Sequence, residues 1–194
     1  MSNVEQILAA HVAHLEPRRC PQQAIAAFEC LLADFVIVLI AGHFSPEARS
    51  IVRTYACAFG NGPSTLVGEV RGVPAPVAAF GHGLLAHWFD WDDTHDESHV
   101  HGGAVIFSAL LAVSDVCNAA GNPVATATFA GSCIAAYDVA CRLGGFLKDL
   151  GPRGWMPTGS GATIAAAAAC ARLLGLGHQG IQSAMGIAAA NAGL

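Results

Sequence analysis

Apolar segments with helical periodicity follow one another along almost the whole chain, and prolines or glycines separate them. Pro21 opens a long apolar segment that ends at Gly42, and Ser45-Pro46-Glu47 has the order of an N-cap, a first-turn proline and an acidic first turn. Only residues 65–73 have the composition of an extended segment. Helices are expected over residues 3–15, 21–41, 46–59, 76–89, 104–119, 123–146, 159–174 and 178–190. The sequence therefore predicts one all-α domain, a compact multi-helix array.

The chain is more apolar than a soluble domain needs to be. Of its 194 residues, 54% are hydrophobic, against roughly 45–50% in a typical domain. The long uncharged stretch over residues 154–171 consists of Ala, Gly, Thr and Pro, which is not the composition of a membrane span, and the N-terminus lacks a signal pattern. We expect a cytoplasmic protein without a membrane segment, whose surplus apolar surface meets a second copy in a homodimer or a further domain.

Charge and cysteine usage exclude several other classes. The formal net charge is −5 and no run of Lys or Arg occurs, so a nucleic-acid partner is not expected. The seven cysteines are scattered singly, without a C-x-x-C pair. They are expected to be reduced core thiols, and neither a disulfide framework nor a structural zinc site is indicated.

Titratable groups crowd together only between Asp90 and Gly103. This segment contains aspartates, a glutamate and three histidines, His95, His99 and His101, although charged residues make up only 12% of the chain. An acidic segment can simply be a solvated loop. Carboxylates beside imidazoles are, however, the components of general acid/base catalysis near neutral pH, so we expect the chemistry here.

The same segment resembles the signature of a known family. Residues 86–95 read Ala-His-Trp-Phe-Asp-Trp-Asp-Asp-Thr-His and residues 101–105 read His-Gly-Gly-Ala-Val, which is similar to the "A-H-x-x-D-[FW]-D-D-T-H … H-P-G-A-V" pattern of the MmgE/PrpD family. Residues 136–144, 153–159 and 171–176 resemble its "A-Y-E-V-x-x-R-L-G", "R-G-F-H-P-T-G" and "A-R-L-L-G-L" motifs, in the same order. The family includes 2-methylcitrate dehydratase, cis-aconitate decarboxylase and iminodisuccinate epimerase.

The resemblance carries expectations about the domain organisation. Residues 1–194 correspond to the N-terminal part of the family's large helical domain. The smaller α/β lid domain, and a family lysine that follows Leu194 in the family pattern, are not in this sequence. We expect the chain to be a fragment or a natural truncation, and to be incomplete as a catalyst on its own.

Three residues are carried over from the family as catalytic positions: Asp90, Thr94 and His101. Asp90 follows the end of a predicted helix, where the helix dipole disfavours an anion, which suits a group that transfers protons. His101 precedes the next predicted helix, whose free N–H groups can hold a substrate carboxylate. Thr94 would supply a hydrogen bond.

The neighbouring residues are given supporting roles. Arg153 and His95 are expected to bind substrate, Arg153 through a bidentate contact with a carboxylate. Asp92 and Asp93 are expected to fix the loop through backbone N–H groups and to orient one of its histidines, although either could be the second carboxylate of a dyad. Met156 occupies the position of a second family histidine and cannot transfer a proton, which puts substrate binding or the protonation step in doubt.

The implied reaction is proton abstraction α to a carboxylate of a small di- or tricarboxylic acid, ending in dehydration, decarboxylation or epimerisation. No cofactor or iron–sulfur cluster is implied, and the sequence does not choose among these outcomes. One alternative is a truncated, non-catalytic helical module that only self-associates. Another is a metal site in which His95, His99 and His101 act with Asp90 or Asp96.

Overall fold

The structure is a computed structural model, and it describes residues 4–149, 154 and 156–192. In chain order, its α-helices are α1 (Val4–His14), α2 (Gln22–Phe44), α3 (Pro46–Cys57), α4 (Ala75–Ala86), α5 (Gly102–Ala119), α6 (Thr126–Leu147), α7 (Thr163–Leu173) and α8 (His178–Asn191). Across the described ranges no strand forms, and β-type pairing is limited to two isolated bridges. The predicted all-α class is confirmed.

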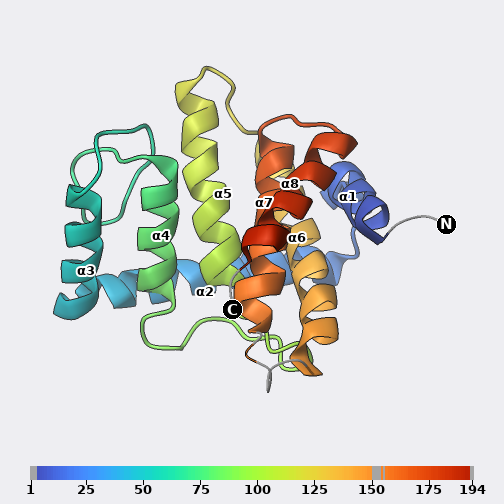
Figure 1. Ribbon diagram of the computed structural model, residues 1–194, viewed down its shortest axis with the longest axis horizontal. Coiled ribbons are helices and arrows are strands. Elements are labelled where there is room, and N and C mark those ends of the chain that lie inside the picture. Colours follow the sequence, from blue (N-terminus) through green and yellow to red (C-terminus); the bar gives the residue numbers. More distant parts are fainter. Residues whose placement is uncertain (1–3, 150–153, 155, 193–194) are drawn as a thin grey trace.

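Most helices stand roughly side by side, and α2 crosses behind them (Figure 1). α2 contacts α3, α4, α5 and α6, while α1 packs against α8 at one end of the array. α5 is the central element, because it contacts α4, α6 and α7 as well as α2. This arrangement leaves the loop between α4 and α5 at one end of the upright helices.

The core around α5 is organised by Phe107, which is fully buried. Its ring centroid lies 5.3 Å from that of Phe35 on α2 and 5.8 Å from that of Tyr137 on α6. Such tilted aromatic contacts join three helices at one point. On the other side of α5, the buried alanines of α7 let that helix pack closely among α5, α6 and α8.

The ends of several helices differ from the sequence prediction. Ser45 caps α3 as expected, its Oγ accepting a hydrogen bond from the N–H of Ala48 at 3.3 Å. α2, however, continues through Gly42 to Phe44. Gly42 is a packing residue of this helix, since a Cβ atom there would collide with the backbone of Leu85. α6 begins at Thr126, later than expected, and a wide π-type turn, Thr158–Ala162, precedes α7.

The predicted extended segment over residues 65–73 is a loop tied by one bridge between Ser64 and Val73. All seven cysteines are free thiols, as expected, but Cys30 and Cys57 are exposed and so are not core residues.

α2 and α5 are long and apolar enough to cross a membrane by length and composition, although no such segment was expected from the sequence. In the most apolar window of each helix, 50% of the residues are buried in α5 and 17% in α2. α5 is thus a core helix of the array, whereas α2 leaves most of its apolar surface uncovered.

Candidate active site

The loop between α4 and α5 folds back so that its two ends meet. His87 caps the C-terminus of α4 and His101 occupies the N-cap position of α5. Asp90 has a φ of 56°, in the left-handed region, where the chain reverses. Aspartate tolerates this conformation better than most residues because its short polar side chain can bond locally. The reversal brings the side chains of the two helix ends into one cluster.

The buried carboxylate of Asp92 contacts the Nδ1 atoms of both imidazole rings. Oδ1 of Asp92 is 2.8 Å from Nδ1 of His87 and 3.4 Å from Nδ1 of His101. The Asp92 side chain is only 1% exposed. A carboxylate that accepts from Nδ1–H fixes both the orientation and the tautomer of an imidazole, and leaves Nε2 for chemistry.

A second carboxylate lies on the opposite, open side of the rings. Oδ1 of Asp90 is 3.9 Å from Nε2 of His87 and 3.8 Å from Nε2 of His101. The Asp90 side chain is 75% exposed. The two rings, with centroids 5.0 Å apart, are therefore held between one buried and one exposed carboxylate.

His101 receives further support from two threonines. Oγ1 of Thr94 lies 3.3 Å from Nδ1 of His101, and Oγ1 of Thr158 accepts a hydrogen bond from the His101 backbone N–H at 2.9 Å. The Thr158 hydroxyl in turn donates to the carbonyl of His99 at 3.4 Å. The turn before α7 thus fixes the backbone of the loop at His101, a contact that the sequence analysis missed because the two residues lie far apart in the chain.

Asp93 contacts the start of α5, and its structural role stays a prediction. Its Oδ1 accepts a hydrogen bond from the N–H of Gly103 at 2.8 Å, while its own N–H donates to Oδ2 of Asp34 on α2 at 3.1 Å. Burial raises the pKa of the Asp93 carboxyl, and the nearby charges of Asp92 and Asp34 add to this, whereas the bond from Gly103 acts in the opposite direction. The backbone of α5 is held by this carboxyl.

Packing accounts for the glycine that stands where the family pattern has a proline. A Cβ atom at Gly102 would collide with the ring of Tyr137, and one at Gly103 would collide with Oδ1 of Asp93. The missing side chains allow the first turn of α5 to lie against α6 and the loop.

The predicted site residues are therefore only partly brought together. Asp90, Thr94 and His101 share one cluster. His95 instead places Nδ1 2.8 Å from Oγ of Ser98, outside the cluster, and its substrate-binding role stays a prediction. Arg153 lies outside the described residues.

The structure also locates Met156 and His87. Met156 is 51% exposed. His87 was missed as a site residue because it reads as the last turn of an apolar helix. Its sequence signal is the aspartate five positions later, Asp92, which becomes a partner once the chain reverses.

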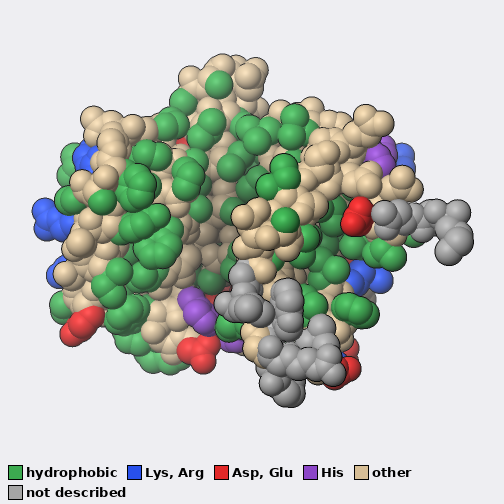
Figure 2. All heavy atoms as spheres, viewed as in Figure 1, with side chains coloured by type: hydrophobic (Ala, Val, Ile, Leu, Met, Phe, Trp, Pro, Cys, Tyr) green, Lys and Arg blue, Asp and Glu red, His purple; other side chains and the backbone are tan. Residues whose placement is uncertain are grey.

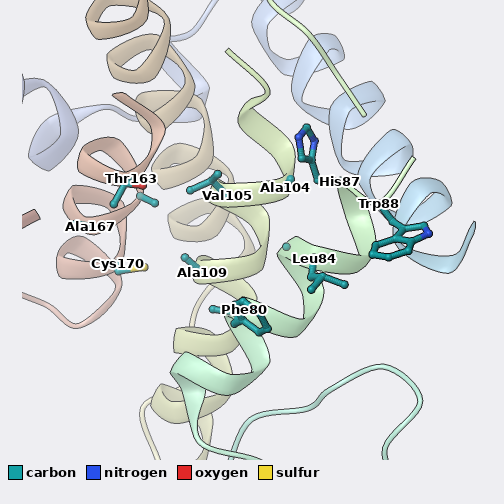
Figure 3. Close-up of a pocket in the computed structure, with 13 residues that line it drawn as sticks. Phe80, Leu84, His87, Trp88, Ala104, Val105, Ala109, Thr163, Ala167 and Cys170 are labelled. Carbon is teal, nitrogen blue, oxygen red and sulfur yellow. The ribbon is translucent and has the colours of Figure 1, made fainter. Parts of the chain in front are cut away.

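The cluster adjoins an apolar pocket of about 780 Å³ between α4, α5 and α7. Figure 2 shows the hollow on this face, with apolar side chains around it and a histidine at its lower end. His87 lies at the end of the pocket nearest the loop (Figure 3). The other labelled lining residues are Phe80, Leu84, Trp88, Ala104, Val105, Ala109, Thr163, Ala167 and Cys170. Walls of this kind suit the carbon skeleton of a small molecule, and His87 is the residue of the cluster that lines them.

The cluster is acidic in the part of the chain that the structure describes. None of the ion pairs there joins a lysine or an arginine to Asp90 or Asp92; both carboxylates pair with the imidazoles of His87 and His101, which carry a charge only when protonated.

Comparison with known proteins identifies the family of the chain. The MmgE/PrpD N-terminal domain matches residues 6–194 of the chain. The chain belongs to the MmgE/PrpD family. Over 98% of its length, this family member is 27% identical to a cis-aconitate decarboxylase-like protein, oryM, of Aspergillus oryzae. It is 22% identical to a cis-aconitate decarboxylase of Aspergillus terreus, again over 98% of its length. It spans 40% of the length of each of these curated MmgE/PrpD relatives.

Proposed function

We propose that this chain supplies the acid–base centre of an MmgE/PrpD lyase or isomerase that removes a proton α to a carboxylate of a small di- or tricarboxylic acid. One observation carries the proposal: ligand atoms of His87, Asp90, Asp92 and His101 all lie within 4.8 Å of one another. Such a group of imidazoles and carboxylates at the end of a pocket is typical of proton-transfer sites. A cytoplasmic location remains the expectation from sequence.

The geometry supports a division of labour within the cluster. Asp92 orients both rings from behind, so that the Nε2 atoms of His87 and His101 point to the side where Asp90 is exposed. The neutral ring of the pair takes the α-proton on Nε2. The protonated ring then gives a proton to the departing hydroxyl in a dehydration, or to the opposite face of the carbon in an epimerisation. In a decarboxylation the departing CO2 leaves its electron pair on the carbon skeleton, so no proton is abstracted and the protonated ring adds one proton to carbon. Asp90 stabilises whichever ring is positively charged.

The acidity of the cluster predicts weak turnover by the 194-residue chain alone. A polycarboxylate would bring negative charges to a site that already holds two aspartates, and like charges repel unless cations intervene. We expect little activity of this chain on cis-aconitate, 2-methylcitrate and iminodisuccinate. Robust turnover of any one of them would show that the site as described needs no further cation.

The test of the function uses the whole natural polypeptide that contains these residues, assayed with the same three substrates. His101→Ala should lower kcat/KM by about 10²–10⁴-fold, the usual contribution of a general acid or base. Asp90→Asn should lower it by less, because Asp90 stabilises the positively charged ring without itself transferring a proton. Asp96→Ala is the matched control, because Asp96 is an exposed aspartate of the same loop. Equal losses in all three variants, or activity on none of the substrates, would contradict the proposal.

A divalent metal is the second candidate, because the same four side chains could contribute one ligand each. This set replaces the one expected from sequence: His87 and Asp92 join it, and His95 is bonded to Ser98 instead. Zinc needs each ligand at about 2.0–2.2 Å, so the cluster would have to contract around the ion. Elemental analysis of untagged protein distinguishes the two functions, since stoichiometric metal that is lost in His87→Gln would favour the metal site.

A further inference from the structure

The Thr158 hydroxyl is hydrogen-bonded to the backbone of the loop between α4 and α5 at two points. Its Oγ1 accepts the N–H of His101 at 2.9 Å, and the hydroxyl donates to the carbonyl of His99 at 3.4 Å. Both directions are fixed, because an N–H only donates and a carbonyl only accepts. Thr158 is buried, which shields these bonds from solvent. One side chain thus holds the loop on both sides of Val100.

The two bonded residues have backbones that need such support. His99 has a φ of 54°, in the left-handed region, which a residue other than glycine adopts only when its surroundings hold it there. His101 is the N-cap of α5, and its imidazole makes no capping hydrogen bond to that helix, all of which lies within the described residues. The ring is therefore left for the cluster, and its place is set by the backbone that carries it.

Thr158 begins the π-type turn Thr158–Ala162, which directly precedes α7. Turns of this wide type occur frequently at functional sites. This turn lies close against α6: a Cβ atom at Gly161 would be 3.2 Å from the backbone N of Gly144 and 3.3 Å from the carbonyl O of Ala140. The hydroxyl therefore extends from a part of the chain that α6 and α7 hold in place.

The loop rests on the same stretch of α6. Val100 is 1% exposed, and a Cβ atom at Gly144 would collide with its side chain. The N–H of His95 donates to the carbonyl of Val100 at 2.9 Å, which closes the segment between them into a short turn. The end of α6 and the start of α7 lie at the same end of the upright helices as this loop (Figure 1). The backbone of His101 is thus placed from α6 and from the turn before α7.

The ring of His101 depends on this placement for its contacts with the cluster. Its Nδ1 lies 3.4 Å from Oδ1 of Asp92 and 3.3 Å from Oγ1 of Thr94. Its Nε2 lies 3.8 Å from Oδ1 of Asp90. These distances are close to or beyond the limit of a hydrogen bond, so a small shift of the backbone decides whether each contact is made. The two hydrogen bonds of Thr158 described above reach the loop backbone and not the ring.

We propose that Thr158 is a positioning residue for His101. Its hydroxyl holds the His101 backbone so that Nδ1 stays on Asp92 and Nε2 stays on the side of the cluster where Asp90 is exposed. Thr158 transfers no proton itself, and any residue that offers the same hydroxyl serves. The inference rests on the proposed function, in which His101 transfers a proton.

The first experiment determines the tautomer of His101 by NMR in the 194-residue chain labelled with 15N-histidine, at about pH 8.5, where imidazoles are ordinarily neutral. The ring signals of His101 are assigned by their loss in His101→Gln. In the wild type they should show the Nδ1–H form, which donates to Asp92. Thr158→Val should move them towards the Nε2–H form, which prevails in free histidine, and Thr158→Ser should keep the wild-type signals.

His178 is the internal reference for this measurement, because its ring lies on α8 and its signals should be the same in all variants. Wild-type His101 in the Nε2–H form, or unchanged His101 signals in Thr158→Val, would overturn the proposal. Circular dichroism checks that Thr158→Val folds, and Thr158→Ala replaces it if it does not. If neither variant folds, Thr158 holds the fold as a whole and the proposal is wrong.

The second experiment measures turnover by the whole natural polypeptide. Thr158→Val should lower kcat by roughly 10²-fold and leave KM within about twofold, because a misplaced catalytic group slows the chemical step. Thr158→Ser should restore most of kcat. Thr126→Val is the control: Thr126 is an exposed threonine at the start of α6, and this variant should match the wild type. A rise in KM alone would assign Thr158 to substrate binding and contradict the positioning role.

A double variant tests whether Thr158 acts through His101. In a His101→Gln background, Thr158→Val should cause no further loss of kcat, since the ring that it positions is absent. A further loss of about tenfold or more would show a separate role for Thr158 and overturn the proposal. If the wild type turns over none of the three substrates but the tautomer of His101 changes as expected, the proposed function fails and the positioning of the ring stands. If the wild type is active and Thr158→Val equals it, the function stands and the positioning role fails.

Discussion

Oδ1 of Asp92 lies 2.8 Å from Nδ1 of His87, and this contact ties the end of α4 to the loop that precedes α5. Because Asp92 is buried and also lies 3.4 Å from Nδ1 of His101, one carboxylate orients two imidazoles that come from different helix ends. The pocket between α4, α5 and α7 opens beside the first of these rings. The histidine–aspartate cluster and the cavity therefore share helices α4 and α5.

Metal removal should leave the activity of the whole polypeptide unchanged. If His87 and His101 act as acid and base, no step needs a Lewis acid, so dialysis against a strong chelator should preserve kcat. The measurement is a turnover assay before and after chelation, with elemental analysis of the same samples. Loss of activity that is restored by one divalent ion would instead support the metal site.

The helices, and the loop between α4 and α5 in which titratable residues gather, were predicted from the sequence because both depend on local patterns. The apolar period marks the helices, and Ser45-Pro46-Glu47 marks the start of α3. His87 was missed because its contacts depend on the left-handed conformation of Asp90. The sequence does not predict that conformation at a residue other than glycine. The bond between the His101 N–H and Thr158 is equally hidden, since it joins distant segments.

The uncovered face of α2 could not be predicted either. The helix is apolar on nearly every side, so its sequence does not say which face packs against the array. Only the positions of α3 to α6 show that the face with Ile37 and Phe44 is left open.

His82 should make the folded chain less stable in mild acid. Its Nε2 accepts the Val67 N–H at 3.2 Å, and burial lowers the pKa of the imidazole, with the Asp115 carboxylate acting in the opposite direction. The unfolded chain therefore binds the proton more tightly. The contribution of His82 to stability is present above about pH 6.5 and is lost as the pH falls towards the lowered pKa.

This loss is measured by urea unfolding at about pH 7.5 and about pH 5. His82→Gln keeps an acceptor but does not titrate, so it should lose less stability between the two values than the wild type, by about 1.4 kcal/mol per unit of pKa lowering. His178→Gln is the control, since His178 lies on α8 and its Nε2 makes an exposed contact with the carbonyl of Gln6. An identical pH dependence in wild type and His82→Gln would refute this role.

Asp93→Asn should stabilise the chain near neutral pH. Burial raises the pKa of Asp93 in the folded state, so its contribution to stability is present at low pH and is lost as the pH rises through that raised pKa. Asparagine keeps an oxygen for the Gly103 N–H but carries no charge. The free energy of unfolding of Asp93→Asn should exceed that of the wild type at neutral pH and approach it in acid. Asp96→Asn is the control and should show neither effect. If Asp93→Asn instead lowers the free energy of unfolding at neutral pH, the charged carboxylate of Asp93 stabilises the fold and this prediction is wrong.

Gly42→Ala should destabilise the crossing of α2 and α4. A Cβ at Gly42 would collide with the backbone carbonyl of Leu85, which cannot move aside as a side chain can. Overpacking of this kind costs about 1–3 kcal/mol. Gly186→Ala on α8 is the matched control. Apart from the adjoining backbone of α8 itself, nothing lies within 4 Å of the added methyl group, and helix propensity predicts a gain of roughly 0.5–1 kcal/mol. The Tm of each variant, measured by thermal unfolding, checks this difference. Equal shifts in Tm would show that α2 and α4 can move apart at Gly42 without cost.

The exchange of solvent deuterium into carbon-bound positions tests the proposed proton transfer most directly. The whole polypeptide is incubated in D2O with whichever of cis-aconitate, 2-methylcitrate and iminodisuccinate it turns over. NMR follows the rate of deuterium entry into the product of a decarboxylation or epimerisation, and into the recovered substrate of a dehydration, whose product gains no new C–H bond. His87→Gln and His101→Gln should each lower that rate by about 10²–10⁴-fold, with Asp96→Ala and chelator-treated wild type unchanged. If either histidine variant keeps more than about a tenth of the wild-type rate, the pair held by Asp92 is not the proton-transfer centre.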